Sequence, residues 1–209
     1  MQDETLLLDS TRLVGKTRNN AHGRSETTSA GVLKSCPEPV WFVLRATYSR
    51  ELKIQEMLRE KGVRTFVPMM WRKRTVAGKA DKKLVPAVSG LCFVFWDRES
   101  VDRFIRSFGD SRPVNYYWDR TLESPLIVPE KAMDDFMKVA STMDEDLIYL
   151  TEISEKLREG QTVKVKDGPF KGVEGKIVRI RKSRRILVEI PGMLAVATTY
   201  VLPEYLEIL

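Results

Sequence analysis

The sequence contains few of the residues on which most catalytic and metal sites depend. Its 209 residues include only two cysteines, Cys36 and Cys92, and one histidine, His22. Two isolated cysteines form no disulfide framework, and they form no Cys/His cluster with the spacing of a zinc site. One histidine in a polar segment cannot supply a Ser/His/Asp site. We therefore expect a protein that is not an enzyme and that has no cofactor or metal ion.

Long apolar runs are missing as well. No run approaches the roughly 20 apolar residues that cross a bilayer as a helix. The short cluster at residues 6–8 lies among acidic residues and lacks the basic region of a secretory signal. We therefore expect no membrane partner. We also expect a cytoplasmic protein, since that is the default compartment, and a monomer.

Positive charge, by contrast, is in excess and unevenly distributed. The formal net charge is +6; residues 40–97 and 152–209 are basic, and residues 98–151 between them are acidic. Separate basic and acidic faces favour a nucleic acid as one partner. Ordinary solvation of a basic protein explains the charge equally well, so charge alone does not decide between the two interpretations.

The apolar pattern divides the chain into four segments. Residues 1–38 are expected to form a disordered leader, because neither a period of 2 nor one of 3.6 persists there. Residues 39–141 predict an α+β domain with helices on a mostly antiparallel sheet. Residues 142–159 predict a linker. Residues 160–209 predict five short strands that close into a small β-barrel.

The expected elements follow from local patterns, with continuous apolar runs for buried strands and apolar stripes of helical spacing for helices. Pro68 interrupts the second strand, which suggests an edge or a bulge. In the first domain we expect strands at 41–46, 64–71, 91–96 and 113–118 and helices at 50–61, 100–108 and 130–141. In the barrel we expect strands at 162–166, 175–181, 185–189, 195–200 and 206–208.

Residues 72–86 predict a long basic hairpin loop with a turn at Gly78. Like charges so close together repel one another, which favours binding of phosphates or of an acidic protein loop. A solvated loop without a partner is the alternative. The six bases of this loop are Arg72, Lys73, Arg74, Lys79, Lys82 and Lys83.

A glycine-rich turn lies between two β-rich runs at residues 167–178. It contains Gly168, Pro169, Gly172 and Gly175. Glycine supplies backbone angles that residues with a Cβ avoid, and proline fixes one of the turn angles in advance. The pattern therefore predicts a strand, a tight turn and a second strand.

Three stretches carry a resemblance to the NusG family. GPFKGVEG at 168–175 resembles the KOW motif, and WFVL at 41–44 and SGLCFVFW at 89–96 resemble strands of the NusG N-terminal domain. The stretches RILVEIPGMLAVATTYVLPEYLE and PLIVPEKAMDDFMKVA are similar to the UpxY group. That group consists of specialised NusG paralogues that act on capsular polysaccharide operons. Together these stretches extend the resemblance over residues 40–209.

The resemblance implies a NusG-like N-terminal domain followed by a KOW β-barrel. It also implies an operon-specific transcription elongation and antitermination factor. Such a factor binds the clamp of RNA polymerase and suppresses pausing or termination, here at capsular polysaccharide operons. Its further partners would be the non-template DNA strand or the nascent leader RNA. Through the KOW barrel it would bind a ribosomal protein or a termination factor.

The resemblance also assigns candidate site residues, with two departures from the family pattern. The family commonly has an aromatic residue at the position of Leu91, and its housekeeping form has one at the position of Pro191. The polymerase would contact Trp41, Leu44, Leu91 and Phe93. Non-template DNA would meet Arg50, Lys53 and Lys61. The six hairpin bases would also meet nucleic acid or a polymerase loop. The KOW partner would meet Arg179, Arg181, Lys182, Arg184, Arg185, Pro191 and Met193.

Several alternatives stay open at this point. The four residues expected to contact the polymerase are instead buried in the core if they behave as aromatic and aliphatic strand residues usually do. The basic tip around Ser183 serves solubility alone if it has no partner. The chain as a whole is a stand-alone RNA-binding or ribosome-associated KOW protein if it acts outside transcription. Whether the two domains pack together is also open.

Overall fold

The computed structural model describes residues 38–209 except 77–78, 153, 155–156, 158 and 181. The predicted leader at 1–38 therefore lies outside the described residues, apart from its last position. All described residues belong to one compact unit. Among them, no helix has the length and apolar character needed to cross a membrane.

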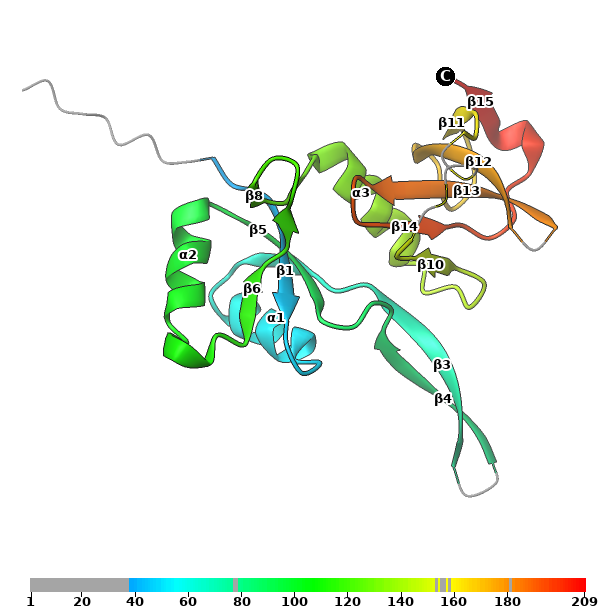
Figure 1. Cartoon of the computed structure of the whole chain (residues 1–209). Helices are drawn as coiled ribbons and strands as arrows, with labels where there is room; N and C mark the ends of the chain where they lie inside the picture. The colour runs from blue at the N-terminus through cyan, green and yellow to red at the C-terminus, as the bar shows by residue number, and fades with distance from the viewer. Residues whose placement is uncertain (1–37, 77–78, 153, 155–156, 158, 181) are drawn as a thin grey trace, which may run out of the picture. The chain divides into compact units, whose positions relative to one another are not determined.

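The first part of the described chain is built on a five-stranded antiparallel sheet, here called the central sheet (Figure 1). Its path runs β2-β5-β1-β6, and β9 also pairs with β1. The predicted central strands are confirmed, and the second predicted strand ends before Pro68. The strands are β1 (Val40–Ala46), β2 (Arg64–Phe66), β5 (Leu91–Trp96), β6 (Val114–Tyr116) and β9 (Ile127–Val128).

Three helices accompany this sheet, as predicted: α1 (Glu51–Glu60), α2 (Arg98–Arg106) and α3 (Glu130–Ala140). Asp97 caps α2, because its Oδ1 accepts a hydrogen bond of 2.9 Å from the Ser100 backbone N–H. A short 3₁₀ helix (Gly109–Ser111) follows α2, and a small hairpin of β7 (Trp118–Asp119) and β8 (Ser124–Pro125) lies between β6 and β9. The sequence did not predict this small hairpin.

Strand β1 separates two apolar cores. Phe42 and Leu44 face a core that contains side chains of α1 and α2. Trp41 and Val43 face the other core, which contains side chains of α3 and of the C-terminal strands. Successive side chains of a strand point to opposite faces, so one continuous apolar run fills both cores.

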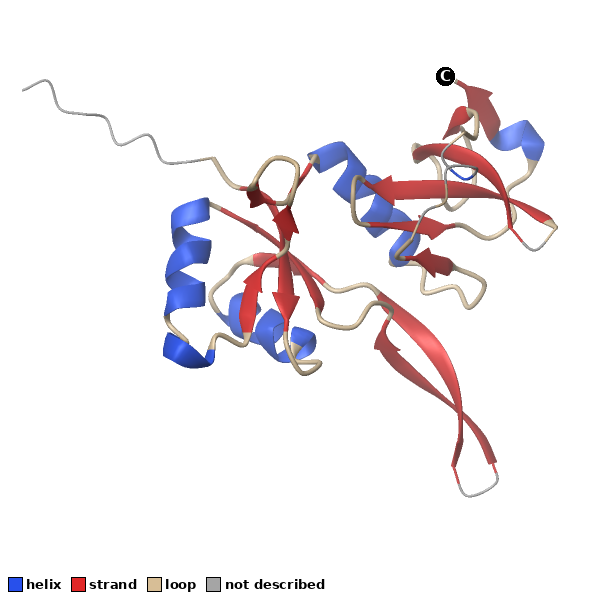
Figure 2. Ribbon diagram, in the orientation of Figure 1, coloured by secondary structure: helices blue, strands red, loops and turns tan. Residues whose placement is uncertain are grey.

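The predicted basic loop is a regular two-stranded hairpin, β3 (Met69–Val76) and β4 (Lys79–Pro86), here called the basic hairpin (Figure 2). Its ladder runs without interruption from the Met69–Pro86 pair to the Val76–Lys79 pair. The predicted hairpin is confirmed, but its arms are regular strands and not loop. The sequence pattern missed these strands because the backbone ladder does not depend on side-chain burial, and charged side chains hid the strand pattern. The turn predicted at Gly78 lies outside the described residues.

The C-terminal part forms a six-stranded antiparallel sheet, here called the C-terminal sheet, in the order β10-β14-β13-β12-β11-β15. All five predicted strands are present, and β10, from the predicted linker, pairs with β14 as a sixth. Closure of the five strands into a barrel stays a prediction. The strands are β10 (Ile148–Leu150), β11 (Thr162–Val165), β12 (Glu174–Ile180), β13 (Ser183–Ile190), β14 (Leu194–Ala197) and β15 (Leu206–Ile208), with a 3₁₀ turn at Pro203–Tyr205.

Two glycines of the predicted turn have clear architectural roles. Gly172 has a φ of +88°, a region that residues with a Cβ rarely adopt. A Cβ on Gly175 would lie 2.5 Å from the carbonyl oxygen of Leu187 on the neighbouring strand. The turn therefore needs glycine for a backbone angle at one position and for a close strand approach at the other.

Candidate functional site

The basic hairpin presents its bases to solvent. Arg72, Lys73, Arg74, Lys82 and Lys83 are all exposed. The register places Arg72 opposite Lys83 and Lys73 opposite Lys82. Like charges directly opposite each other across an antiparallel pair are destabilising, so an anionic partner would stabilise this hairpin.

Two acidic residues offset part of this charge. The Arg74 guanidinium donates from Nε to Asp81 Oδ2 at 2.7 Å, and the Lys82 ammonium pairs with Glu145. The hydrogen bond from Lys82 lowers the pKa of Glu145 below its usual value. In the described part of the chain, Arg72 and Lys83 make no ion pair and keep their charge available. For Lys79 the structure gives the backbone pairing with Val76.

The four residues predicted to contact the polymerase are all buried. Trp41, Leu91 and Phe93 are 1%, 2% and 0% exposed and share one core. Leu44, at 0% exposure, lies in the other core on the opposite face of β1. The structure therefore brings three of the four together and separates Leu44 from them.

Helix α3 packs against the core that contains Trp41, Leu91 and Phe93. The ring of Phe136 lies 5.7 Å from that of Phe93 and 6.3 Å from that of Phe66. The Arg64 guanidinium lies 5.0 Å from the Trp41 ring centroid and pairs with Asp134 of α3 at 3.6 Å. In this arrangement Trp41, Leu91 and Phe93 are not accessible to a partner.

An exposed aromatic surface lies beside this core and was missed by the sequence analysis. Tyr117 and Trp118 are 38% and 52% exposed. Together with Arg45 and Arg120 they line a cavity of about 510 Å³, here called the aromatic cavity. The Tyr117 backbone N–H donates to the Val43 carbonyl at 2.8 Å, which joins the cavity to β1 in the central sheet. The tyrosine-tyrosine-tryptophan run at 116–118 is the sequence signal for this surface, but it lies within the strand expected at 113–118.

The electrostatics of the aromatic cavity favour an anionic or polar-rimmed partner. Arg45 and Arg120 are exposed and, among the described residues, make no ion pair. Asp119 is committed to the turn, because its Oδ1 accepts from the backbone N–H groups of Thr121 at 2.8 Å and Leu122 at 3.1 Å. Burial, followed by a hydrogen bond of 2.8 Å to Asp102, raises the pKa of Tyr116, so its phenol stays neutral.

The three bases predicted on the first helix divide between its two ends. Arg50 and Lys53 line one cavity of about 230 Å³ with Phe108 and Ser111. Lys61, after the last turn of α1, lines a different cavity. Arg50 also places its guanidinium 5.6 Å from the Tyr48 ring centroid.

The bases predicted to bind a KOW partner fall into an exposed group and one half-buried residue. Arg179, Lys182 and Arg184 are exposed, and Arg179 lies opposite Arg184 in the β12–β13 register. Arg185 is half-buried, and its guanidinium donates to the carbonyl oxygens of Asp146 at 2.6 Å and Thr198 at 2.7 Å. Those two contacts give Arg185 a structural role. The remaining predicted residues are Pro191, which is exposed, Met193, which packs against the core, and Arg181, which lies outside the described residues.

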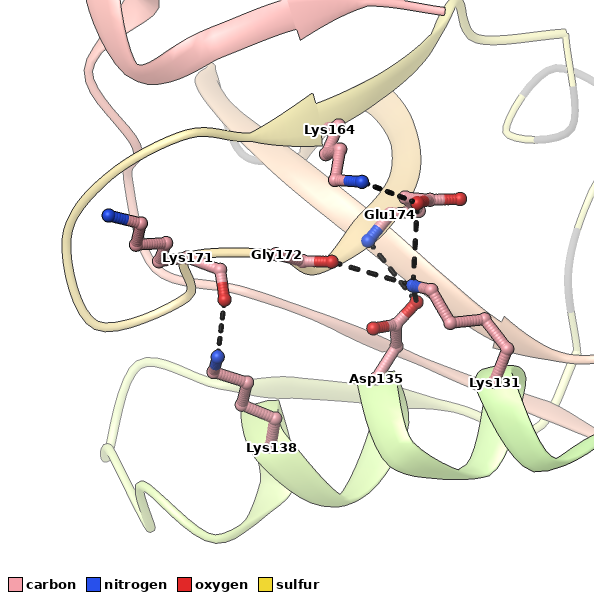
Figure 3. A network of polar contacts seen from close by, with 7 residues as sticks. All are labelled: Lys131, Asp135, Lys138, Lys164, Lys171, Gly172 and Glu174. Atoms are coloured by element: carbon pink, nitrogen blue, oxygen red, sulfur yellow. Dashed lines mark hydrogen bonds and ion pairs between the residues drawn. The ribbon is translucent and has the colours of Figure 1, made fainter.

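A polar network joins α3 to the glycine-rich turn (Figure 3). Lys131 pairs with Asp135 on the same helix and with Glu174 at 3.6 Å, and the Glu174 backbone N–H donates to Asp135 at 3.2 Å. Lys138 donates to the carbonyl of Lys171. Side chains of α3 thus hold the turn that carries Gly172. The turn therefore contacts α3 in addition to shaping the C-terminal sheet.

Comparison with known proteins identifies both parts of the chain. Residues 39–137 match the family model described as transcription termination factor nusG, and residues 159–189 match the KOW motif. The chain is also similar to a solved structure described as "Domain interaction in Thermotoga maritima NusG". That similarity has 19% sequence identity and a TM-score of 0.43, and it covers 82% of this chain and 98% of that chain. The search of curated proteins found no match. The two family matches identify a NusG N-terminal domain at residues 39–137 and a KOW motif at residues 159–189.

Proposed function

We propose that this chain is an operon-specific transcription elongation and antitermination factor that binds RNA polymerase and suppresses pausing or termination. Its two matched segments, a NusG domain and a KOW motif, support a role in transcription elongation or termination. The resemblance of residues 125–140 and 185–207 to the UpxY group supports capsular polysaccharide operons as the target.

The observation that carries polymerase binding is the aromatic cavity. A protein interface has an apolar, aromatic centre and a polar rim, with tryptophan, tyrosine and arginine contributing most of the affinity. Tyr117 and Trp118 supply such a centre, and Arg45 and Arg120 supply the rim. Each is exposed, so the surface is accessible without a rearrangement.

Trp41, Leu91 and Phe93 have a supporting role in this proposal. In the present arrangement they form the core beneath α3 and support the strands that carry Arg45 and border Tyr117. Their direct contact with the polymerase would require a rearrangement that exposes them. Leu44 would not join them, because it faces the other core.

The basic surfaces would bind further partners in addition to the polymerase surface that the aromatic cavity binds. We assign the basic hairpin to phosphates or to acidic loops of the polymerase. Arg50, Lys53 and Lys61 would meet the non-template DNA strand or the leader RNA. The exposed bases Arg179, Lys182 and Arg184 would meet the partner of the KOW segment, a ribosomal protein or a termination factor.

A binding experiment with core RNA polymerase, free of nucleic acid, tests the aromatic cavity. The double variant Tyr117→Ala/Trp118→Ala should bind at least about 30-fold more weakly, since truncation of such central residues costs about 2 kcal/mol or more. Tyr48→Ala is the matched control, because it removes an aromatic side chain that is 87% exposed and lies outside the cavity. Wild-type affinity in the double variant would remove the cavity from the mechanism.

An in vitro transcription assay tests the function itself. The chain should increase read-through of a capsule-operon leader by the cognate polymerase, and the double variant should not. If the chain has no effect on pausing or termination, the proposal fails. Recovery of ribosomes or RNA without polymerase from cells would favour the alternative of a stand-alone RNA-binding or ribosome-associated KOW protein.

A further inference from the structure

Strand β15 forms one edge of the C-terminal sheet, and β10 forms the other. Among the described residues, β15 pairs only with β11. The Leu209 N–H donates to the Thr162 carbonyl at 3.1 Å, so the backbone groups of Leu209 point towards β11. Backbone groups alternate in direction along an antiparallel strand, so those of Leu206 and Ile208 point away from β11, towards the free edge.

The free edge of β15 offers three hydrogen-bonding groups. The Leu206 N–H donates to the Pro203 carbonyl within the 3₁₀ turn. Within the described part of the chain, the Leu206 carbonyl and both backbone groups of Ile208 have no partner. Unpaired groups of this kind are a template for a strand of another chain. A short edge limits such pairing, so side-chain contacts beside it must select the partner.

A cavity of about 410 Å³ adjoins this edge and is here called the β15 cavity. Its apolar lining comes from Val163, Ile177, Leu206 and Ile208. Val163 is fully buried and Ile208 is 64% exposed, so the cavity reaches from the apolar core to the surface. A strand added to β15 would place alternate side chains beside Leu206 and Ile208, over this cavity.

The β12–β13 hairpin adds positive charge to the same cavity. Arg184 lines the cavity, and Arg179 lies directly opposite Arg184 in the register. Both are exposed, and neither makes an ion pair with a described residue. Glu207 of β15 points to the opposite face, because side chains alternate along a strand. Like charges opposite each other are destabilising, so an acidic partner would stabilise this pair.

We propose that the β15 cavity docks an extended, acidic segment of a partner protein, which adds a strand to the free edge of β15. The backbone of that segment pairs with Ile208 and with the Leu206 carbonyl. One of its apolar side chains enters the cavity, and its carboxylates reach Arg184 and Arg179. In strand addition, backbone hydrogen bonds supply affinity and side-chain pockets supply specificity. A nucleic acid would match the two arginines but neither the strand edge nor the apolar lining.

This surface differs from the remaining residues predicted to bind a KOW partner. Pro191 and Met193 belong to the turn between β13 and β14, and neither lines the β15 cavity. The outer edge of β14 is already paired with β10. The inference rests on the proposed function in one respect, namely that the KOW segment has a protein partner. It adds where that partner docks and which chemistry it needs.

The test measures binding of labelled synthetic peptides to the purified full chain by fluorescence anisotropy, without polymerase or nucleic acid. The acidic probe alternates isoleucine with threonine and ends in a run of glutamates. The basic probe ends in lysines instead, and the methylated probe is the acidic one with N-methyl groups on its strand residues. The acidic probe should bind at least about tenfold more tightly than the other two, which lose charge complementarity or backbone donors.

Two substitutions, each with a matched control, locate the binding. Ile208→Thr keeps a β-branched residue but removes apolar surface, so it should weaken binding of the acidic probe about fivefold. Leu209→Thr should bind as wild type, because Leu209 is 60% exposed and does not line the cavity. Arg184→Gln should weaken binding about threefold and flatten its salt dependence. Lys166→Gln removes an exposed base outside the cavity and should change neither.

Three results would overturn the inference: no saturable binding of the acidic probe, equal binding of all three probes, or wild-type affinity in Ile208→Thr. A dimer of the chain that Ile208→Thr dissociates in sedimentation experiments would also overturn it, since the edge would then bind a second copy. Read-through and core-polymerase binding are measured separately. Loss of peptide binding with intact read-through would refute the docking surface alone, and the converse would refute the proposed function alone.

Discussion

The ring of Phe136 on α3 lies 5.7 Å from the ring of Phe93 on β5, and both side chains are fully buried. Phe136 also meets the rings of Phe66 at 6.3 Å and Tyr149 at 6.4 Å in edge-to-face geometry. One phenylalanine therefore joins two strands of the central sheet to β10 of the C-terminal sheet. This cluster explains why a strand residue expected to meet the polymerase is in the core.

Phe136→Ala should lower the free energy of unfolding by about 3–5 kcal/mol, because it leaves a cavity at the centre of an aromatic cluster. Urea denaturation followed by tryptophan fluorescence measures the change. Phe136→Leu is the control and should cost clearly less, since it keeps most of the buried volume. Equal stability of the alanine variant and the wild type would mean that α3 does not pack on β5.

Arg185 and Arg184 are neighbours in sequence, but we expect opposite results when each is replaced by glutamine. Arg185→Gln removes hydrogen bonds to the carbonyls of Asp146 and Thr198, so it should lower stability by about 1–3 kcal/mol. Arg184→Gln changes an exposed side chain and should leave the free energy of unfolding within about 0.5 kcal/mol of wild type. Thermal unfolding of both variants checks this, and equal midpoints would contradict the structural role of Arg185.

Gly175→Ala should disrupt the C-terminal sheet. The added Cβ would lie 2.5 Å from the Leu187 carbonyl oxygen, so β12 and β13 could not keep their present approach. Gly62→Ala is the control, because its φ of +74° strains a Cβ while no atom lies within 4 Å of the added carbon. We expect the control to cost about 1 kcal/mol and to keep the hydrogen-exchange protection of β12, which Gly175→Ala should lose. Unchanged protection in Gly175→Ala would refute the predicted clash.

Cys92 should be unreactive in the folded chain. Burial raises the pKa of its thiol to about 12 from an ordinary value of 9.0, so almost no thiolate is present at pH 8. In a Cys36→Ser background, iodoacetamide should alkylate Cys92 far more slowly in buffer than in urea. Rapid alkylation in buffer would show that β5 is not buried.

The same shift has a consequence for stability at high pH. The folded pKa of Cys92 is raised, so the contribution of the neutral thiol is fully present below pH 9 and is lost as the pH rises towards 12. Between pH 8 and pH 10.5, the urea midpoint should therefore fall further in the Cys36→Ser chain than in Cys36→Ser/Cys92→Ala. An identical fall in both chains would contradict this assignment.

Buried elements could be predicted from the sequence because their side chains report burial directly. The runs at 41–46 and 91–96 are largely apolar, and β1 and β5 have apolar side chains on both faces. The stripes of the three helices are equally clear. The basic hairpin was missed as a ladder because its strands are stabilised by their own backbone pairing, which leaves no apolar signature.

The site was harder to predict, because it depends on which apolar residues stay exposed. Phe93 and Tyr117 are both aromatic residues in predicted strands, but Phe93 lies in β5 beneath Phe136 of α3, whereas Tyr117 lies between two strands and is 38% exposed. The same holds for Arg184 and Arg185, whose roles depend on carbonyls that the fold brings close. Sequence patterns identify candidates for burial, whereas exposure follows from tertiary contacts between distant segments.

The alternation of β1 between two cores makes this strand unusually sensitive to changes in its length. Deletion of one residue within β1 would reverse the facing of the β1 residues on one side of the deletion, so side chains such as Phe42 would turn towards α3 or side chains such as Val43 would turn towards α1 and α2. A deletion that shifts the C-terminal end of the strand would also move Arg45 off the rim of the aromatic cavity. In a scan of single-codon deletions across the gene, β1 should therefore tolerate none, since each deletion disturbs the cores that β1 separates.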